Sequence, residues 1–478
     1  MKHFIISILI LFTSGRTIAQ DITGSWAGSL PAGGTTLHIV FNITKNADGS
    51  LKSTMDSPDQ KAFGIACSKT TMIKDSLMIE IALIGGGYKG QWDGKDGITG
   101  TFRQGGGQVA LTLKRISAND KAALSKDPVH SQTPKPLFNY VSEDVEYDNA
   151  DKSVHYGATF TRPKGDGKYP AVIIISGSGT QDRDGTIFGH KLYWVLADYL
   201  TKNGIAVLRV DDRGAGKSTL GNDIKNATSR TFSYDAETSL NYLLTRSDVD
   251  KKHVGLIGHS EGGIIAPMVA ARRKDVNFIV LWGAPEIGGL KINTAQNAYA
   301  LKQAGANETQ INAYSDLNNK ILGLFASSPN VDTLDARIAP VFNTWQKAQT
   351  PETLTALHAA NISAPAVFPQ FNQLYNKAWM RYFITYDPTT DLSKVKCAVL
   401  AVNGEKDTQV DAASNLGLIK AILTKNGNKD FEIKHLPGLN HLLQTAQTGD
   451  LSEYEKIEET MSPDAMKIIC DWIKMHAK

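Results

Sequence analysis

Ser260 is the residue of this chain best placed to act as a nucleophile, because it lies in the run Gly-His-Ser-Glu-Gly at 258–262. An apolar stretch of strand length, residues 254–257, precedes this run and an apolar helical pattern follows it, so Ser260 is expected on a sharp turn between a strand and a helix. The two glycines would let strand and helix approach closely. The turn would expose the Ser260 hydroxyl and place the backbone N–H of Glu261 at a helix N-terminus, where it can stabilise an oxyanion.

A serine hydroxyl needs a base within hydrogen-bond reach and an acid that orients the base. Both follow later in the chain: Asp407 comes after an apolar strand at 397–402, and His441 comes after a strand at 431–436. Parallel strands end at one edge of their sheet, so these two loops and the turn at Ser260 should converge there. The sequence therefore predicts a triad of Ser260, Asp407 and His441.

Three other residues compete for these roles. Glu405 lies two residues before Asp407 and is the rival acid. His435 and His259 are the rival bases, but His435 is expected within a strand and His259 adjoins the nucleophile on the turn itself. We favour Asp407 and His441.

A second oxyanion donor is expected in the loop that follows the buried strand ending at Ile175, where the chain reads Ser-Gly-Ser-Gly-Thr-Gln-Asp-Arg-Asp-Gly at 176–185. Its glycines would let a backbone N–H face the substrate oxygen, and Gly177 or Ser178 is the expected donor. A phosphate-binding loop would need a following lysine that is absent here. The run 211–218 ends in Gly-Lys-Ser without the earlier glycine of a phosphate loop, and we interpret it as a structural loop whose charges support the site.

The elements that must position these residues form a mostly parallel sheet. From residue 171 to residue 282, fully apolar strands alternate with helical patterns, which indicates a sheet covered by helices on both faces. Helical periods then dominate from 288 to 388, with dense aromatic residues between 368 and 383 and acidic residues scattered among polar ones. An insertion of that size between two strands predicts a helical cap over the strand ends.

Ahead of this α/β domain, short alternating runs separated by glycine-rich turns predict a small antiparallel β-domain, a barrel or sandwich, over residues 20–115. A segment rich in Ala, Ser, Lys, Asp and Pro, residues 116–137, is expected to be a linker. The catalytic domain is then residues 138–478, with the cap inserted at 288–388.

The first 19 residues have the pattern of a signal peptide: a short basic start, an apolar run and a small-residue cleavage site before Gln20. We therefore expect an exported protein, periplasmic or secreted, with no membrane association after removal of the signal. The whole chain carries 51 basic and 48 acidic residues, and its net charge of +3 argues against a nucleic-acid partner. Three widely spaced cysteines show neither a disulfide framework nor metal-ligand spacing, and no cofactor is required by the motifs. The oligomeric state is left open.

Taken together, the motifs at 176–185, 211–218, 258–263 and 436–441 resemble those of bacterial α/β-hydrolase esterases of the serine-aminopeptidase-like (Hydrolase 4) group. The resemblance covers roughly residues 140–478. It implies the α/β-hydrolase fold and a carboxylic-ester hydrolase that uses Ser260, Asp407 and His441. One departure is Ser176, which stands before Gly177 where many relatives have histidine.

The functional hypothesis is hydrolysis of a small-molecule ester through an acyl-enzyme on Ser260. Two alternatives stay open. One keeps the fold but makes the protein a peptidase or an acyltransferase. The other is a lipid- or carbohydrate-binding protein whose hydrolase domain is inert.

Overall fold

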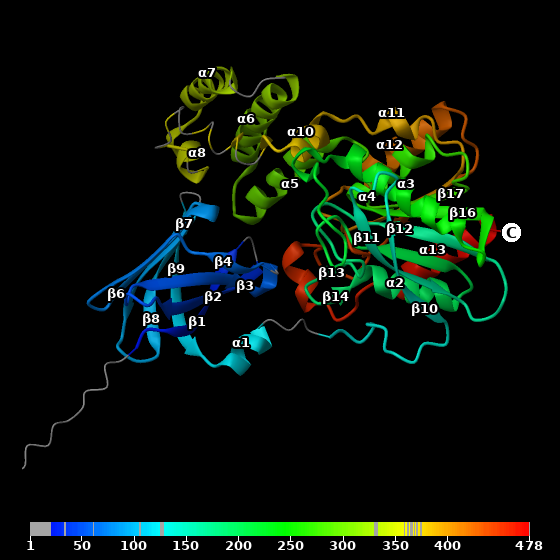
Figure 1. Cartoon of the computed structure of the whole chain (residues 1–478). Helices are drawn as coiled ribbons and strands as arrows, with labels where there is room; N and C mark the ends of the chain where they lie inside the picture. The colour runs from blue at the N-terminus through cyan, green and yellow to red at the C-terminus, as the bar shows by residue number, and fades with distance from the viewer. Residues whose placement is uncertain are drawn as a thin grey trace, which may run out of the picture. The chain divides into compact units, whose positions relative to one another are not determined.

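The structure is a computed structural model that describes residues 21–32, 35–60, 62–104, 107–124, 129–328, 333–357, 359–360, 363, 367, 369, 371–372 and 375–477. The expected signal peptide, residues 1–19, lies outside these residues, as do residues 125–128 of the expected linker and parts of the expected cap. The chain divides into two compact units, Met1–Lys126 and Asp127–Lys478, and each is described by itself (Figure 1).

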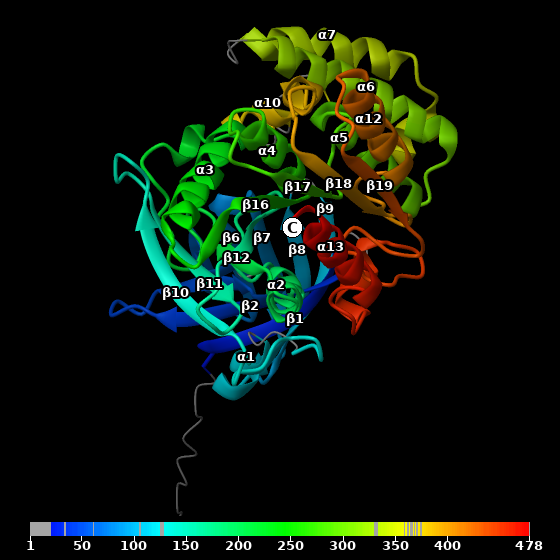
Figure 2. The same cartoon turned by 90° about the vertical axis from the view of Figure 1, so that its right-hand side faces the viewer.

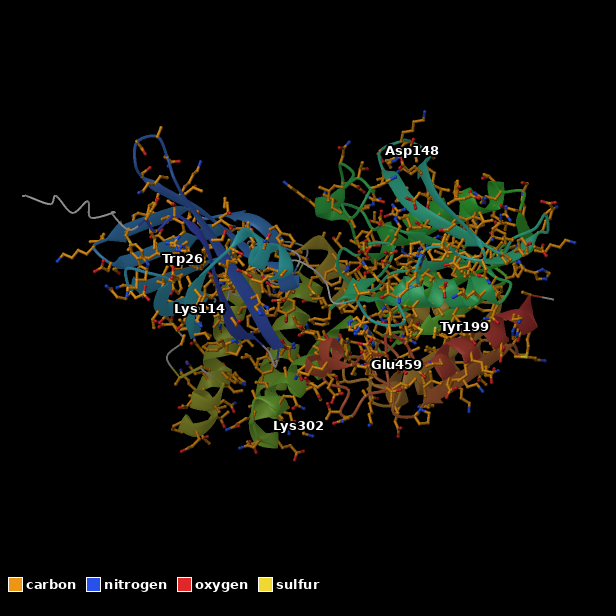
Figure 3. All side chains as sticks on the ribbon, turned by 90° about the horizontal axis from the view of Figure 1, so that it is seen from below. Trp26, Lys114, Asp148, Tyr199, Lys302 and Glu459 are labelled. Carbon is orange, nitrogen blue, oxygen red and sulfur yellow. The ribbon has the colours of Figure 1, made fainter. Side chains whose placement is uncertain are left out.

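The first unit is a single antiparallel sheet of nine strands in the order β4-β3-β2-β1-β9-β8-β7-β6-β5. The sheet curls so that β3 approaches β5 at the opposite edge. Ser53 Oγ lies 2.7 Å from Thr70 Oγ1, and the Cys67 N–H donates to the Ser53 carbonyl at 3.1 Å. This forms a half-barrel rather than a sandwich of two sheets. Buried side chains such as Trp26, labelled in Figure 3, and Tyr88 fill its interior. Its strands and its helix are β1 (Gly24–Ala32), β2 (Thr35–Lys45), β3 (Leu51–Ser57), β4 (Ala62–Ala66), β5 (Lys69–Ile73), β6 (Ser76–Ile81), β7 (Gly86–Trp92), β8 (Gly97–Gln104), β9 (Gly107–Ile116) and α1 (Ala118–Leu124).

The second unit is built on an eight-stranded sheet in the order β10-β11-β15-β12-β16-β17-β18-β19. The hairpin of β10 and β11 lies antiparallel at one edge, and every pairing from β15 to β19 is parallel. The strands are β10 (Val141–Asp148), β11 (His155–Arg162), β12 (Tyr169–Ile175), β15 (Ala206–Val210), β16 (Val249–His259), β17 (Phe278–Trp282), β18 (Ala398–Gly404) and β19 (Phe431–Leu436). A separate two-stranded ribbon joins β13 (Thr186–Ile187) and β14 (His190–Lys191).

Helices cover both faces of this sheet, as the apolar strands require. One face packs against α3 (Ser229–Thr245), α4 (Glu261–Ala270) and α12 (Ala412–Lys425), and the other against α2 (Leu192–Lys202) and α13 (Pro463–His476) (Figure 2). Alternate side chains of β12 enter the two cores: Ile173 packs on the first face and Ile174 on the second. The predicted α/β architecture of this unit is confirmed.

Between β17 and β18 the chain leaves the sheet and forms helices with their own apolar core, which contains Phe325, Phe342 and Trp345. The described helices of this cap are α5 (Gly289–Gln303), α6 (Glu308–Ser327), α7 (Leu334–Lys347), α8 (Pro351–Ala356) and α10 (Ala378–Thr385). The chain then returns through α11 (Thr389–Leu392) to β18.

Glu286 lies just after β17, where the chain enters the cap. Its side chain is fully buried, and neither carboxyl oxygen has a hydrogen-bond partner among the residues that the structure describes. Burial, with the negative charges of Asp387 and Asp391 on the returning segment, raises the pKa of Glu286 to about 8. A buried carboxyl of this kind is tolerated in its protonated form and opposes folding once it must ionise.

This predicts a pH-dependent gain in stability for Glu286→Gln. The folded chain keeps a proton that the unfolded chain, with the ordinary pKa of 4.5, releases. The free energy of unfolding of the natural protein should therefore fall by up to about 1.4 kcal/mol per pH unit from this group as the pH rises from 4.5 to 8. Glutamine cannot ionise, so the variant should gain more in melting temperature at pH 8 than at pH 5.

Thermal unfolding at the two pH values measures this gain. Glu308→Gln, at an exposed glutamate in the first turn of α6, is the matched control and should change little at either pH. An equal effect of Glu286→Gln at pH 5 and pH 8 would contradict the assignment.

Candidate active site

The turn at Ser260 has the geometry that its sequence predicts. Ser260 joins β16 to α4 with φ 53° and ψ −121°, a left-handed conformation that is costly for a residue with a side chain. A Cβ on Gly258 would lie 2.1 Å from the Gly262 carbonyl oxygen, and a Cβ on Gly262 would lie 2.3 Å from the Ile175 carbonyl oxygen. Both positions therefore exclude any other residue while strand and helix keep this contact.

Asp407 and His441, which lie 34 residues apart in the chain, form a buried pair. His441 Nδ1 lies 2.6 Å from Asp407 Oδ2, and Asp407 Oδ1 accepts the backbone N–H groups of Gln409 and Val410 at 2.8 Å each. Three donors thus fix the carboxylate. A proton on Nδ1 that is bonded to Asp407 leaves Nε2 as the basic nitrogen of His441.

Trp282, the last residue of β17, holds both sides of the site. Its carbonyl oxygen accepts the Ser260 N–H at 2.8 Å, and its indole N–H donates to the His441 carbonyl at 3.0 Å. The ring of His441 lies with its centroid 5.0 Å from that of His259, the neighbour of Ser260 in the chain. Ser260 and the Asp407–His441 pair therefore lie at the same edge of the sheet.

The alternative acid, Glu405, and the alternative bases, His435 and His259, lie in different environments. Glu405 is exposed, and its carboxylate accepts the Gly438 N–H at 3.3 Å. His435 is exposed on β19. His259 is buried, and its Nδ1 lies 3.0 Å from the Tyr193 hydroxyl; burial holds the pKa of His259 well below its usual value.

The loop that follows β12 is clamped by Asp212. One carboxylate oxygen accepts the Ser176 hydroxyl at 2.6 Å and the other accepts the Gln181 N–H at 2.8 Å, so both ends of the loop are tied to one side chain. Burial raises the pKa of Asp212 to about 7. Asp212 belongs to the 211–218 run, and these bonds show that this run holds the loop after β12 in place.

Tyr193 accepts a hydrogen bond from one of the two backbone N–H groups predicted in the loop after β12. The Gly177 N–H donates to the Tyr193 hydroxyl at 3.1 Å, while that hydroxyl contacts Gln181 Oε1 at 2.8 Å. The backbone donor of Gly177 is therefore already engaged, which leaves the Ser178 N–H as the remaining donor of the pair. The role of Tyr193 was not predicted from the sequence. The available signal was its position in the first turn of α2, the helix that follows this loop in the chain.

Glu261 follows the nucleophile and is the first residue of α4, so its N–H lacks an intrahelical acceptor. Its side chain is buried, and Oε1 accepts the Ser229 hydroxyl at 2.6 Å and the Trp379 indole N–H at 2.7 Å. Burial raises the pKa of Glu261. The side chain of Glu261 thus has partners that its sequence position did not indicate.

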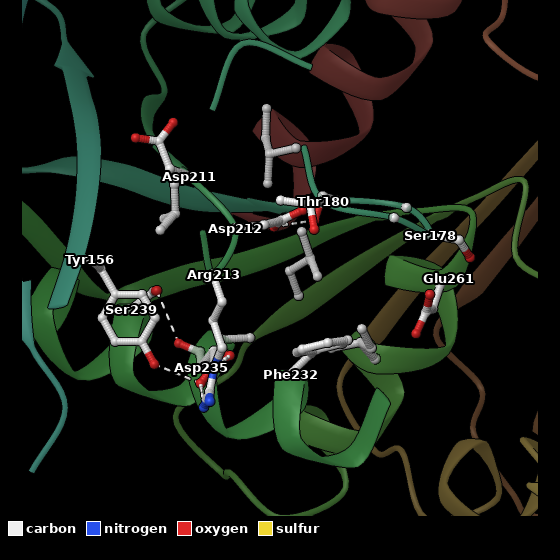
Figure 4. Close-up of a pocket in the computed structure, with 18 of the residues that line it drawn as sticks. Tyr156, Ser178, Thr180, Asp211, Asp212, Arg213, Phe232, Asp235, Ser239 and Glu261 are labelled. Atoms are coloured by element: carbon white, nitrogen blue, oxygen red, sulfur yellow. Dashed lines mark hydrogen bonds and ion pairs between the residues drawn. The ribbon is translucent and has the colours of Figure 1, made fainter. Parts of the chain in front are cut away.

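A pocket of about 390 Å³ is lined in part by Ser178 and Glu261 and lies between the end of β12, the 176–180 loop, α3 and α4 (Figure 4). In Figure 4, Ser178 and Glu261 lie at one end of the pocket, and Tyr156, Arg213 and Asp235 lie at the other. Apolar side chains that line it include Ile173, Ile175, Val210, Phe232, Ala236, Ile265 and Trp379.

Within the described part of the chain, no cluster of histidine, cysteine or acidic residues could hold a metal ion. None of the helices in that part is both long enough and apolar enough to cross a bilayer. The described Cys67, Cys397 and Cys470 are free thiols.

Residues 188–310 match the model of the Hydrolase_4 family, described as serine aminopeptidase, S33. This range contains Ser260 and Glu261 but neither Asp407 nor His441. A curated relative, the esterase EstD of Thermotoga maritima, is 33% identical over 124 residues, which is 25% of this chain and 28% of that protein. The match thus spans little more than a quarter of the relative's length.

Among solved structures, an esterase of Pyrococcus furiosus aligns with a TM-score of 0.43 and 15% identity, covering 74% of this chain and 98% of that one. Est1E of Butyrivibrio proteoclasticus aligns with a TM-score of 0.39 and 14% identity, covering 70% of this chain and 98% of that one. The matched residues 188–310 contain β15, β16 and β17 of the eight-stranded sheet, together with α2, α3 and α4, which cover its faces. The second unit has the α/β-hydrolase fold, and the small β-domain precedes it.

Proposed function

We propose that this protein is a serine hydrolase of carboxylic esters. The observation that carries the proposal is the left-handed turn at Ser260 beside the buried Asp407–His441 pair, whose atoms lie 2.6 Å apart. A hydroxyl raised on such a turn, with an oriented imidazole at the same sheet edge, is the arrangement that nucleophilic acyl transfer requires. The match of residues 188–310 to a hydrolase family supports it.

In the proposed reaction, His441 Nε2 takes the Ser260 proton while Oγ forms a bond to the ester carbonyl carbon. The carbonyl oxygen becomes an oxyanion, for which the N–H groups of Glu261 and Ser178 are the proposed donors. The carbon–oxygen bond to the alcohol then breaks, and His441 returns its proton to the leaving oxygen. Water attacks the acyl-enzyme with His441 again as base, which releases the acid and restores Ser260.

Asp407 supports this cycle by holding the histidine tautomer. Its carboxylate fixes the proton on Nδ1, so Nε2 faces the reaction as a base. The charge that develops on His441 is stabilised by the same carboxylate, which three hydrogen bonds hold in place.

An aminopeptidase on the same fold is the second candidate, since the family description names that activity. Such an enzyme must bind a substrate ammonium with carboxylates left unpaired in the pocket. The acidic cap residues that the structure describes, Glu308, Asp316, Asp335, Glu352 and Asp387, are exposed. At the pocket itself, Asp212 and Glu261 already accept hydrogen bonds from neighbouring groups.

The largely apolar pocket instead suits an apolar acyl or alcohol group, for which each buried methylene contributes about 0.8 kcal/mol. The name of the Thermotoga maritima relative is consistent with an ester substrate. We propose that a small-molecule ester is the partner, and that the protein acts after export, as the pattern of its first 19 residues suggests.

This proposal predicts that purified protein hydrolyses short- to medium-chain aryl esters and cleaves aminoacyl arylamides poorly. The measurement is kcat/KM for a matched acetyl or butyryl ester and arylamide on one preparation. Ser260→Ala should lower ester turnover on the order of 10³- to 10⁶-fold while the melting temperature shows that it folds. Faster cleavage of the free-amino arylamide would favour the peptidase, and absence of both activities would favour a binding protein with an inert hydrolase domain.

A second prediction ranks the two acids of the 403–410 loop. Asp407→Asn should lower kcat by roughly 10⁴-fold, because the amide favours the wrong tautomer of His441. Glu405→Gln is the matched control, two residues away and exposed, and should retain most of the activity. Steady-state kinetics of the two variants decide the ranking, and the reverse order would move the acid to Glu405.

A further inference from the structure

The side chain of Glu261 joins α4, which carries it, to α3 and to the cap. Its Oε1 accepts the hydroxyl of Ser229, the first residue of α3, at 2.6 Å and the indole N–H of Trp379, in cap helix α10, at 2.7 Å. Ser178, in the loop after β12, lines the same pocket as Glu261. Figure 4 shows Ser178 and Glu261 facing each other at one end of the pocket.

These contacts are unusual in their chemistry. Glu261 is 2% exposed, yet the two partners of its carboxyl group, the Ser229 hydroxyl and the Trp379 indole N–H, are uncharged. A buried carboxyl group is costly unless its acceptors are satisfied, so each of these donors stabilises the arrangement. An apolar residue at this position could pack against the same neighbours but could not tie them together.

Trp379 gives this arrangement a link to substrate. Its indole lines the same 390 Å³ pocket that Ser178 and Glu261 border, while its N–H is held by Glu261. The indole belongs to the cap, whereas the proposed oxyanion donors belong to α4 and to the loop after β12. A substrate group that fills the pocket would therefore lie against the residue that connects the cap to those donors.

We infer that the Glu261 carboxyl group is a positioning residue that couples the docking of cap helix α10 to the geometry of the oxyanion hole. This inference rests on the proposed function, because it concerns the same Ser260 reaction. The Glu261 backbone N–H and the Ser178 N–H are the proposed donors, and the Glu261 side chain ties Trp379 of the cap to the residue that supplies the first of these donors. Loss of the bridge should misplace the donors in the transition state more than it weakens substrate binding.

The test uses the full protein, an aryl butyrate as substrate, four single variants and the double variant of Trp379→Phe with Glu261→Leu. Trp379→Phe removes the indole N–H and keeps an aromatic ring, and Glu261→Leu removes the acceptor. Glu261→Gln keeps an acceptor oxygen at the position of Oε1. Trp345→Phe is the matched control, because the Trp345 indole N–H donates to the Ala313 carbonyl inside the cap at 2.7 Å, away from the pocket.

Trp379→Phe and Glu261→Leu should each lower kcat about tenfold, less than the loss of a whole oxyanion donor, with KM changed less than about twofold. Their effects should not add in the double variant, since both break one link. Glu261→Gln should restore at least about half of the natural kcat, and Trp345→Phe should leave kcat unchanged.

Three results would overturn the inference: a natural kcat in Trp379→Phe, effects that add in the double variant, or an equal loss in Trp345→Phe. If Glu261→Leu does not fold, Trp379→Phe with Glu261→Gln still decides the matter. An enzyme that hydrolyses the ester through Ser260 while Trp379→Phe keeps full kcat refutes the coupling alone. A natural protein that hydrolyses no ester refutes the proposed function and the coupling with it.

Discussion

The backbone of Ser260 is the constraint on which the site depends. A residue with a side chain adopts φ 53° only when its surroundings over-determine it, and here the surroundings are a strand and a helix in near contact. Gly258 and Gly262 permit that contact because any Cβ would meet a backbone oxygen at little more than 2 Å. The carbonyl of Trp282 fixes the other side of the turn through the Ser260 N–H. The hydroxyl is thereby presented at the sheet edge where the loops carrying Asp407 and His441 end.

Around this turn, buried carboxyl groups hold loops and helices in place through hydrogen bonds. Asp212 ties the two ends of the 176–181 loop, Asp407 fixes the histidine, and Glu261 connects α4 to α3 and to the cap. Burial raises the pKa of Asp212 and of Glu261, as expected for acids in a region of low dielectric. In such a region a fixed N–H donor stabilises developing charge far more than it would in water, so the burial that makes these acids costly would also favour the proposed oxyanion.

Another buried carboxyl group, that of Glu286, lies where the cap joins the sheet. Glu286 has no hydrogen-bond partner in the described part of the chain, and it lies where the chain leaves β17 for the cap. It contributes no bond that orders the site. Its raised pKa instead makes the junction of cap and sheet depend on pH.

Much of the fold could be predicted from the sequence, because fully apolar strands and amphipathic helices have distinct periods. The strand predicted at 431–436 has these bounds in the structure, and the strand predicted at 397–402 lies at Ala398–Gly404. Asp407 and His441 could be predicted to meet, since each lies in a loop that follows a parallel strand of the same sheet.

Other features depend on contacts that no local pattern encodes. The hydrogen bond of the Gly177 N–H depends on the hydroxyl of Tyr193, which lies in α2, 16 residues later in the chain. The bond between Trp379 and Glu261 joins residues 118 positions apart. The β-domain could not be assigned to a barrel or a sandwich, because that choice depends on whether β3 meets β5.

The central claim is that Ser260 carries the acyl group during turnover. Mixing the protein with an aryl acetate, quenching in acid within the first turnovers and mapping the peptides by mass spectrometry tests it directly. The account predicts an acetyl group on the peptide that contains Ser260, in an amount that rises when deacylation is slowed. Acetyl transfer to another residue, or ester hydrolysis without any covalent intermediate, would contradict it.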